Sequence, residues 1–256
     1  MREKSSISIK GGAFSTGAVH RGRRDLKMDK LYVDRLVEWM KEHRNEKEAE
    51  PMSQYMRNQF AFLGIKTPQR KQLLRDFFTR YGLPPLKDLD GILFALWNER
   101  EREFQYAALF LLEKNIKKLA SEHIELAEKL IIVKSWWDTV DYLAANIVGT
   151  ILKKHPELIS TYAEKWIYSN NIWLQRTALL FQLKYKKETD ELLLYRYIRT
   201  CISSKEFFIQ KAIGWALREY SKVNPDSVIR FVESEDLPAL SRREALKVIN
   251  KARDYK

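Results

Sequence analysis

The stretch SWWDTVD at residues 135–141 contains the side chains whose types and spacing are best suited to chemistry. Trp137 and Asp141 are four residues apart, so on a helix an indole and a carboxylate share one face. An indole face and a carboxylate both attract positive charge, and the pair is therefore suited to holding a cationic group. Taken alone, the stretch also fits a simpler interpretation, in which Trp137 is a core residue and Asp141 is a solvated surface charge.

The local pattern distinguishes the two carboxylates of this stretch. Ser135 followed three residues later by Asp138 has the spacing of a capping box, which assigns Asp138 to the start of a helix. Asp141 is then left without a structural role and becomes the candidate for chemistry. The same spacing recurs at residues 203–206 and 241–244, where we expect further helix starts.

The elements that must position these residues are helices. Apolar residues recur with a helical period, for example within residues 33–40 and 74–81, and no segment shows a convincing strand pattern. Pro68 and Pro225 are typical of a first helical turn, and Gly82 is typical of a helix end. The sequence therefore predicts an all-α fold.

The helices are predicted to repeat about every 35 residues. Asp141, Arg176 and Lys211 are separated by this interval, and three glutamines that precede similar apolar segments show the same interval or twice it: Gln105, Gln175 and Gln210. Helix-pair repeats of this length stack into a curved solenoid whose inner helices line a concave groove. Trp137 lies four residues before Asp141 and Trp215 four after Lys211, so we expect a cationic, aromatic groove that holds one carboxylate.

The charge of the chain points to a polyanionic partner. The 256 residues have a formal net charge of +12 and are 45% hydrophobic, which is enough for a substantial core. The first 30 residues contain eight Lys/Arg and three Asp/Glu, so the other 226 keep a charge of +7. Nucleic acid is the favoured partner and an anionic membrane surface a weaker one.

The domain organisation is predicted to be simple. Residues 1–28 are rich in Gly, Ser and Arg, and we expect a flexible basic extension outside the fold. It is either an arm that strengthens nucleic-acid binding or a segment upstream of a natural start at Met28. Residues 29–256 are predicted to form a single repeat domain.

Several function classes are disfavoured. Cys201 is the only cysteine, which excludes an intramolecular disulfide and multi-cysteine zinc sites, and we expect it to be a buried small hydrophobe. The four histidines form no short-spaced ligand motif: His20, His43, His123 and His155. We therefore predict no metal and no cofactor. No apolar stretch approaches a membrane span, and we expect a cytoplasmic protein, associated with the nucleoid if the source is bacterial.

Several motifs support a resemblance to a known family. They are Glu50-Pro51-Met52 with Tyr55-Met56, Phe62-Leu63-Gly64-Ile65 with Thr67-Pro68, Lys134-Ser135-Trp136-Trp137-Asp138 with Asp141, Asn171-Ile172-Trp173-Leu174-Gln175-Arg176, and Phe207-Phe208-Ile209-Gln210-Lys211-Ala212-Ile213-Gly214-Trp215. From about Asp29 to about Lys251 the chain resembles the AlkD-type DNA alkylation repair enzymes, which are alkylpurine DNA glycosylases built from HEAT-like helical repeats. The N-terminal extension is not explained by this resemblance.

The resemblance implies an activity and a set of site residues. It implies hydrolysis of the N-glycosidic bond of cationic N3- and N7-alkylated purines in double-stranded DNA, with the lesion still largely stacked rather than fully flipped out. It assigns Trp137, Asp141 and Trp215 to the active site, and Tyr55 and Arg176 to contacts with DNA.

The implied chemistry is physically coherent. An alkylated purine already bears a positive charge and leaves as a neutral base, so little acid catalysis is needed. A fixed carboxylate at Asp141 can stabilise the oxocarbenium-like sugar and orient the attacking water. Trp137 and Trp215 can each add cation–π attraction of about 0.5 to 2 kcal/mol. No lysine is obviously placed as a Schiff-base nucleophile, so we expect a monofunctional glycosylase that leaves an abasic site.

Further basic residues are expected to contact the DNA backbone. For Arg176 we favour a phosphate contact over a structural ion pair because of its register with Asp141 and Lys211. A phosphate site and a merely solvated helix start are both open for Thr67, Arg70 and Lys71. The remaining candidates for the backbone track are Lys134, Lys211, Arg218, Arg242 and Arg243. We expect the other five tryptophans to be core or packing residues: Trp39, Trp97, Trp136, Trp166 and Trp173.

Two hypotheses about function remain. The first is a monomeric DNA glycosylase that acts on double-stranded DNA without an obligate protein partner. The second is a non-catalytic HEAT-like module that binds nucleic acid or a protein. Asp141 favours the first, because a groove that only binds phosphates gains nothing from a carboxylate among its cations.

Overall fold

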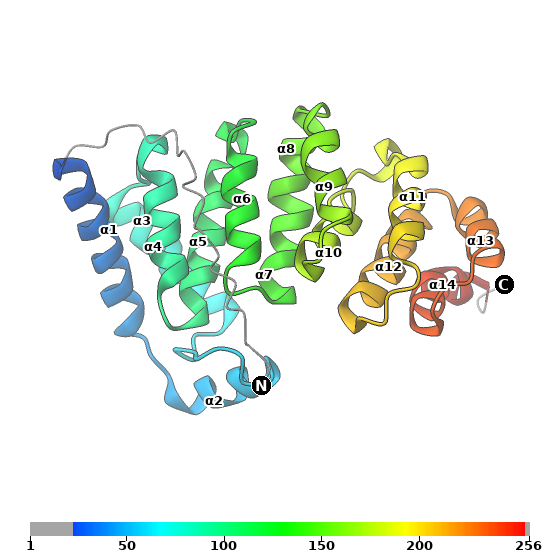
Figure 1. Cartoon of the computed structure of the whole chain (residues 1–256). Coiled ribbons are helices and arrows are strands. Elements are labelled where there is room, and N and C mark those ends of the chain that lie inside the picture. Colours follow the sequence, from blue (N-terminus) through cyan, green and yellow to red (C-terminus); the bar gives the residue numbers. More distant parts are fainter. Residues whose placement is uncertain (1–22, 254–256) are drawn as a thin grey trace, which may run out of the picture.

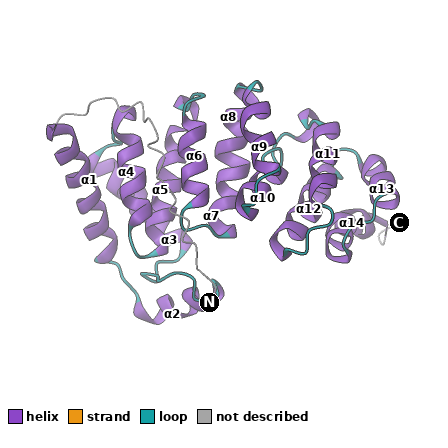
Figure 2. Ribbon diagram, viewed as in Figure 1, coloured by secondary structure: helices purple, strands orange, loops and turns teal. Residues whose placement is uncertain are grey.

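The structure is a computed structural model that describes residues 23–253. These residues form helices joined by short loops, with no strand among them (Figures 1 and 2). The predicted all-α helical-repeat solenoid is confirmed. Residues 1–22, most of the predicted extension, lie outside the described residues, whereas residues 23–28 form the first turns of α1.

The helices follow one another along the array in chain order (Figure 1). The α-helices are α1 (Arg23–Lys41), α2 (Glu46–Tyr55), α3 (Thr67–Tyr81), α4 (Leu89–Asn98), α5 (Arg102–Asn115), α6 (His123–Ile132), α7 (Trp137–Tyr142), α8 (Gly149–Lys154), α9 (Glu164–Ile167), α10 (Ile172–Leu180), α11 (Glu191–Cys201), α12 (Phe207–Tyr220), α13 (Pro225–Ser234) and α14 (Ala239–Arg253). Three short 3₁₀ segments are η1 (Leu86–Asp88), η2 (Ile116–Lys118) and η5 (Lys186–Glu188), and two π-helical segments are η3 (Leu143–Val148) and η4 (Ile159–Ala163).

The helices pack in two layers. In one layer α3 contacts α5, which contacts α7, followed by α10, α12 and α14 in the same manner. In the other layer α1 packs on α4, α4 on α6, and α9 on α11. One continuous hydrophobic core, from Val33 to Ile249, lies between them. The candidate site residues on helices lie in the first of these layers, except Tyr55 at the end of α2.

The 35-residue register corresponds to a repeated local contact. In α5, α10 and α12 a glutamine side chain donates to the backbone carbonyl six residues earlier. The three bonds are Gln105 to Glu99 (3.0 Å), Gln175 to Ser169 (2.8 Å) and Gln210 to Ser204 (3.0 Å). These glutamines therefore hold the loop that leads into each inner helix, which explains their spacing.

The predicted capping boxes are wrong. Ser135 donates to the carbonyl of Ile131 (2.6 Å) and does not cap α7. Ser241 lies inside α14 and donates to the carbonyl of Gln210 (2.8 Å) on α12. Residues 203–206 precede α12 but provide no side-chain cap. The physical reason is competition: a serine hydroxyl takes the nearest backbone acceptor, and the preceding turn or a neighbouring repeat offers one.

Other helix boundaries agree with the sequence. Pro68 lies in the first turn of α3, Gly82 ends that helix with a φ of 76°, and Pro225 begins α13. Asn and Asp side chains accept backbone N–H bonds at three helix starts, from Asn171, Asp190 and Asn224. These boundaries are set by local chemistry, so the sequence alone predicts them.

Candidate active site

Two adjoining pockets lie on either side of the turn that carries Trp137 and Asp141. The Trp137 pocket, of about 540 Å³, is formed by residues from Pro51 to Phe62 with residues of α3, α5 and α7. The Asp141 pocket, of about 420 Å³, is formed by residues of α7, η3 and α12 and by residues 183 and 184 in the turn that follows α10. Asp138 and Tyr142 line both pockets, so the two are continuous.

The three residues assigned to the active site are divided between these pockets. Trp137 lines the first pocket, where the exposed ring of Tyr55 meets it edge-on, with ring centroids 6.0 Å apart. Asp141 and Trp215 line the second pocket, although they are 74 residues apart in the chain. The fold therefore brings together two indoles, a phenol and a carboxylate that the sequence predicted to share one groove.

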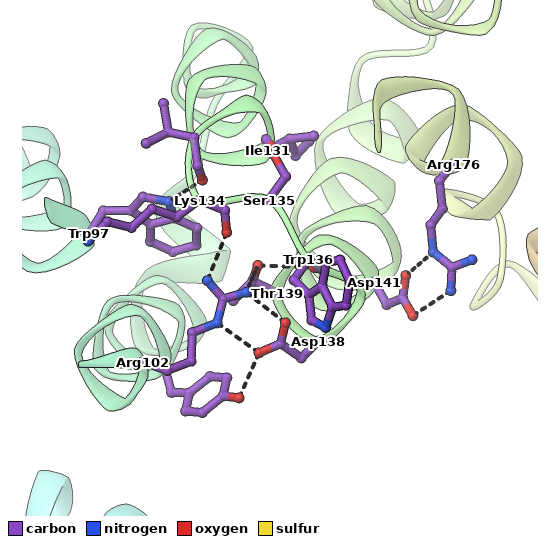
Figure 3. Close-up of polar contacts among 12 residues, drawn as sticks. Trp97, Arg102, Ile131, Lys134, Ser135, Trp136, Asp138, Thr139, Asp141 and Arg176 are labelled. Carbon is purple, nitrogen blue, oxygen red and sulfur yellow. Dashed lines mark hydrogen bonds and ion pairs between the residues drawn. The ribbon is translucent and has the colours of Figure 1, made fainter. Parts of the chain in front are cut away.

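Asp141 forms a bidentate ion pair with Arg176 (Figure 3). The Arg176 Nε donates to Oδ1 (2.6 Å) and one terminal nitrogen donates to Oδ2 (2.8 Å). The other terminal nitrogen donates to the carbonyl of Phe208. Burial raises the pKa of Asp141 above its ordinary value, while the hydrogen bonds and charge of Arg176 act in the opposite direction. The carboxylate is therefore held in one orientation by a buried cation.

This ion pair corrects two expectations. Asp141 was predicted to lack a structural partner, and it has one. Arg176 is buried in the ion pair that the sequence analysis set aside in favour of a phosphate contact. Register alone could not distinguish these roles, because a repeat interval places Arg176 beside Asp141 as well as along the groove.

Asp138 is held by a second arginine from the preceding repeat. Arg102, which is completely buried, donates to both carboxylate oxygens (2.9 and 2.6 Å), and the Tyr106 hydroxyl adds a third bond (2.6 Å). Asp138 is thus structural, as predicted, but through Arg102 and Tyr106 rather than a capping box. Neither partner was predicted from the sequence. Tyr106 lies 35 residues before Asp141, and Lys71 lies 35 residues before Tyr106. The 35-residue register could therefore have identified Tyr106.

The predicted phosphate-binding residues of α3 lie at the Trp137 pocket. Thr67 and Lys71 are exposed and line it. Arg70 also lines the pocket but is buried: its guanidinium lies 4.3 Å from the centre of the Tyr106 ring and donates to the Thr67 hydroxyl (3.2 Å). The start of α3 therefore presents a hydroxyl and one ammonium to the pocket, while Arg70 packs behind them.

Most of the predicted cations beyond this pocket are engaged within the protein. The Lys134 ammonium donates to the carbonyls of residues 98 and 99. Lys211 and Arg218 both bind Glu244, at 3.0 and 2.8 Å. Arg242 donates to the carbonyl of residue 235 (3.1 Å), and Arg243 is exposed on α14.

A third pocket contains cations that the sequence analysis did not select. This lysine pocket, of about 780 Å³, is lined by Lys184, Lys186, Lys187 and Lys222 with one carboxylate, Glu219. It shares Lys184 and Glu219 with the Asp141 pocket, so the basic surface continues directly from the candidate site. The run Lys-Tyr-Lys-Lys at residues 184–187 was a visible indication of it.

The expected packing roles of the other tryptophans are confirmed. Trp97 and Trp166 are fully buried, and Trp39 packs against the core. Trp136 and Trp173 form an aromatic cluster with Phe208, with ring centroids 5.0 to 5.7 Å apart. This cluster lies beside the Asp141–Arg176 pair, because Arg176 binds the carbonyl of Phe208.

Outside the pockets, the described residues include one cysteine, Cys201. Cys201 is buried, as predicted, and burial raises the pKa of its thiol to about 11. Within residues 23–253, His, Cys, Asp and Glu side chains form no group that could hold a metal ion. None of the described helices is long and apolar enough to cross a lipid bilayer.

The fold and the site define an all-α repeat protein whose inner helices combine indoles, oriented carboxylates and lysines. The model of the DNA alkylation repair enzyme family matches residues 36–249, and the chain belongs to this family. A solved structure described as a predicted DNA alkylation repair enzyme from Enterococcus faecalis is 34% identical, with a TM-score of 0.76, over 81% of this chain and 97% of that chain. The comparison with curated proteins found no match. The predicted family is confirmed, and the protein is a DNA alkylation repair enzyme.

Proposed function

We propose that the protein is a monofunctional DNA glycosylase. It hydrolyses the N-glycosidic bond of cationic N3- and N7-alkylated purines, such as 3-methyladenine and 7-methylguanine, in double-stranded DNA and leaves an abasic site. It acts as a monomer, without a cofactor, on a lesion that stays largely stacked. The observation that supports this most directly is the Asp141 carboxylate, held by Arg176 beside Trp215 in a pocket continuous with that of Trp137.

The chemistry requires little from an acid. As the bond between C1′ and the purine nitrogen breaks, its electron pair neutralises the positive charge of the base. Asp141 stabilises the positive charge that develops on the sugar and orients the water that adds to C1′, whose proton passes to solvent. The indoles of Trp137 and Trp215 add cation–π attraction to the lesion or sugar.

Arg176 has an orienting role in this proposal. Both of its bonds to Asp141 are short; they fix the position of the carboxylate and favour its ionised form against the opposing effect of burial. A pre-positioned charge needs no reorganisation when the transition state forms, and this makes it effective in a pocket from which water is partly excluded.

DNA phosphates are proposed to follow the basic residues that flank the two pockets. On one side are Tyr55, Thr67 and Lys71 at the Trp137 pocket. On the other side, the lysine pocket extends from the Asp141 pocket. The second candidate, a non-catalytic nucleic-acid-binding module, accounts for the lysines but not for a carboxylate oriented by a buried arginine.

The deciding experiment is single-turnover release of 7-methylguanine from a defined duplex by the wild type and by Asp141→Asn, with binding to the same duplex measured in parallel. We expect release by the wild type and a rate constant lowered by at least about 100-fold in the variant, at near-equal affinity. Binding without release of 7-methylguanine or 3-methyladenine by the wild type would reject the glycosylase and favour the binding module.

A further inference from the structure

A completely buried arginine, Arg102, makes four hydrogen bonds to the turn that leads into α7 and to its first residues. The Arg102 guanidinium donates to the Lys134 carbonyl (2.8 Å), to the Thr139 hydroxyl (2.9 Å) and to both oxygens of Asp138 (Figure 3). The Lys134 carbonyl lies before α7, and the Asp138 and Thr139 side chains lie in its first turn. One side chain from α5 therefore links the turn to the start of this helix.

The backbone of this turn needs such support. Lys134 has a φ of 50°, in the left-handed region that residues other than glycine rarely adopt. Besides the Arg102 bond to its carbonyl, its ammonium binds backbone carbonyls at the end of α4. Trp97 Nε1 donates to the carbonyl of Val133 (2.9 Å). A strained turn held from several sides is typical of a backbone that must place side chains accurately.

Tyr106 connects this turn to the start of α3. Its hydroxyl donates to Asp138, and the Arg70 guanidinium lies over the face of its ring. Burial and the charge of Asp138 raise the pKa of Tyr106, so the hydroxyl keeps its proton and remains a donor. Arg70 in turn binds Thr67 at the Trp137 pocket. An unbroken set of contacts thus joins the proposed phosphate-binding residues to α7.

Asp138 differs from Asp141 in what remains available to a substrate. Three donors from two residues occupy its oxygens, and its side chain is 7% exposed, whereas Asp141 has two donors from one residue and is 14% exposed. Asp138 nevertheless directly follows Trp137 and lies one helical turn before Asp141. Any shift of Asp138 therefore moves both residues.

We propose that Arg102, Asp138 and Tyr106 are a positioning unit that sets the placement of Trp137 and Asp141 for the glycosylase reaction. The inference rests on the proposed function. None of the three needs to touch the reacting atoms, and Tyr106 is the member that can be tested with the smallest structural change. Tyr106→Phe removes one hydroxyl and keeps the ring beneath Arg70.

The test is single-turnover release of 7-methylguanine by Tyr106→Phe, with duplex affinity and thermal unfolding measured on the same samples. We expect the rate constant at saturating enzyme to fall by about tenfold, because a small misplacement of reacting groups is costly, with affinity within about twofold. Tyr195→Phe is the matched control: Tyr195 lines none of the three pockets, its hydroxyl bonds the buried Ser227 (2.9 Å), and the rate constant of this variant should equal that of the wild type.

A double-mutant cycle distinguishes positioning from a general loss of stability. The effect of Tyr106→Phe should be smaller in a Trp137→Phe background, where only the placement of Asp141 is still affected, and should persist in full in a Trp215→Phe background on α12. A wild-type rate constant in folded Tyr106→Phe, or equal effects in both backgrounds, would overturn the positioning unit alone. Absence of release by the wild type in the same assay would reject the proposed function, and the unit with it.

Discussion

At the scale of single residues, the two carboxylates of α7 show that pairing with arginine does not by itself identify a structural role. Asp138 and Asp141 each bind a buried arginine from a neighbouring repeat. Both line the pocket that contains Trp215, but they differ in the number of donors that bind them and in exposure. We therefore propose Asp141, which has fewer donors and the more exposed side chain, as the residue available for chemistry.

The role of Arg176 can be tested by separating catalysis from binding. Arg176→Gln removes the cation that lowers the pKa of Asp141, so the pKa should rise further above its ordinary value. Since the reaction needs the ionised carboxylate, the rate constant should fall as pH falls through this pKa. We expect the acidic limb of the single-turnover pH profile to move to higher pH in the variant, with the maximal rate constant lowered by about 10- to 100-fold.

The control for this prediction is Arg176→Lys, which keeps a positive charge and should shift the acidic limb less. Breaking a buried ion pair costs stability, of order 3 to 5 kcal/mol, so unfolding must be measured for both variants. A large loss of duplex affinity with an unchanged rate constant and pH profile would instead support the phosphate contact predicted from the register.

At the scale of elements, the loop between α2 and α3 shows how a distant side chain shapes a segment. The buried Glu103 carboxylate accepts three backbone N–H bonds, from Leu63, Gly64 and Ile65, at 2.9 to 3.1 Å. Gly64 has a φ of 86°, and a Cβ placed there would lie 2.0 Å from the carbonyl oxygen of Asn45. This loop carries the chain into α3, where the Trp137 pocket begins.

Gly64→Ala should therefore destabilise the protein strongly. The new methyl group meets backbone that cannot move aside without breaking the Glu103 bonds, so we expect a loss of more than about 3 kcal/mol in the free energy of unfolding from urea titration. Gly82→Ala is the matched control, because Gly82 also has a positive φ, of 76°, but its Cβ would meet nothing within 4 Å. That variant should lose only about 1 kcal/mol. Equal losses in the two variants would argue against a steric role for the close contact.

At the scale of the whole molecule, the basic side chains of residues 23–253 are distributed differently from the prediction. Lys211 and Arg218 share one carboxylate, Glu244, whose pKa is lowered chiefly by its hydrogen bond from Lys211. The lysine pocket next to Asp141 contains four ammonium groups and one carboxylate, Glu219, which pairs with Lys222 (2.7 Å), so positive charge remains in excess there. A polyanion bound across the Asp141 pocket would therefore gain most by extending in that direction.

This distribution predicts the salt dependence of DNA binding. Replacing both Lys186 and Lys187 with alanine should reduce the slope of log affinity against log salt concentration by about 1 to 2 units, because each phosphate contact contributes roughly 0.9. Lys165→Ala is the control, since Lys165 is exposed, pairs with Glu128 and lines none of the three pockets. A slope unchanged in the double variant, measured on undamaged duplex between 50 and 200 mM salt, would remove these lysines from the proposed phosphate path.

Much of the architecture could be predicted because it depends on local rules. Helical periodicity, the prolines of α3 and α13, Gly82 and the 35-residue interval all reflect interactions within a few residues or between identical positions of adjacent repeats. The capping boxes failed for Ser135 and Ser241 because their hydroxyls found other acceptors, and the π-helical segment η3 that follows α7 had no detectable pattern.

By itself, the sequence determined the all-α repeat fold and the grouping of Trp137, Asp141 and Trp215, because side-chain period and repeat interval are properties of the chain. Its motifs, by their resemblance to known proteins, also indicated the family. Only the tertiary structure decided which arginine binds which carboxylate. Arg102 reaches Asp138 and Arg176 reaches Asp141 across repeat boundaries, and such pairings depend on how adjacent helices are rotated against each other. That rotation is set by the packing of the whole core, so it cannot be deduced from the spacing of residues along the chain.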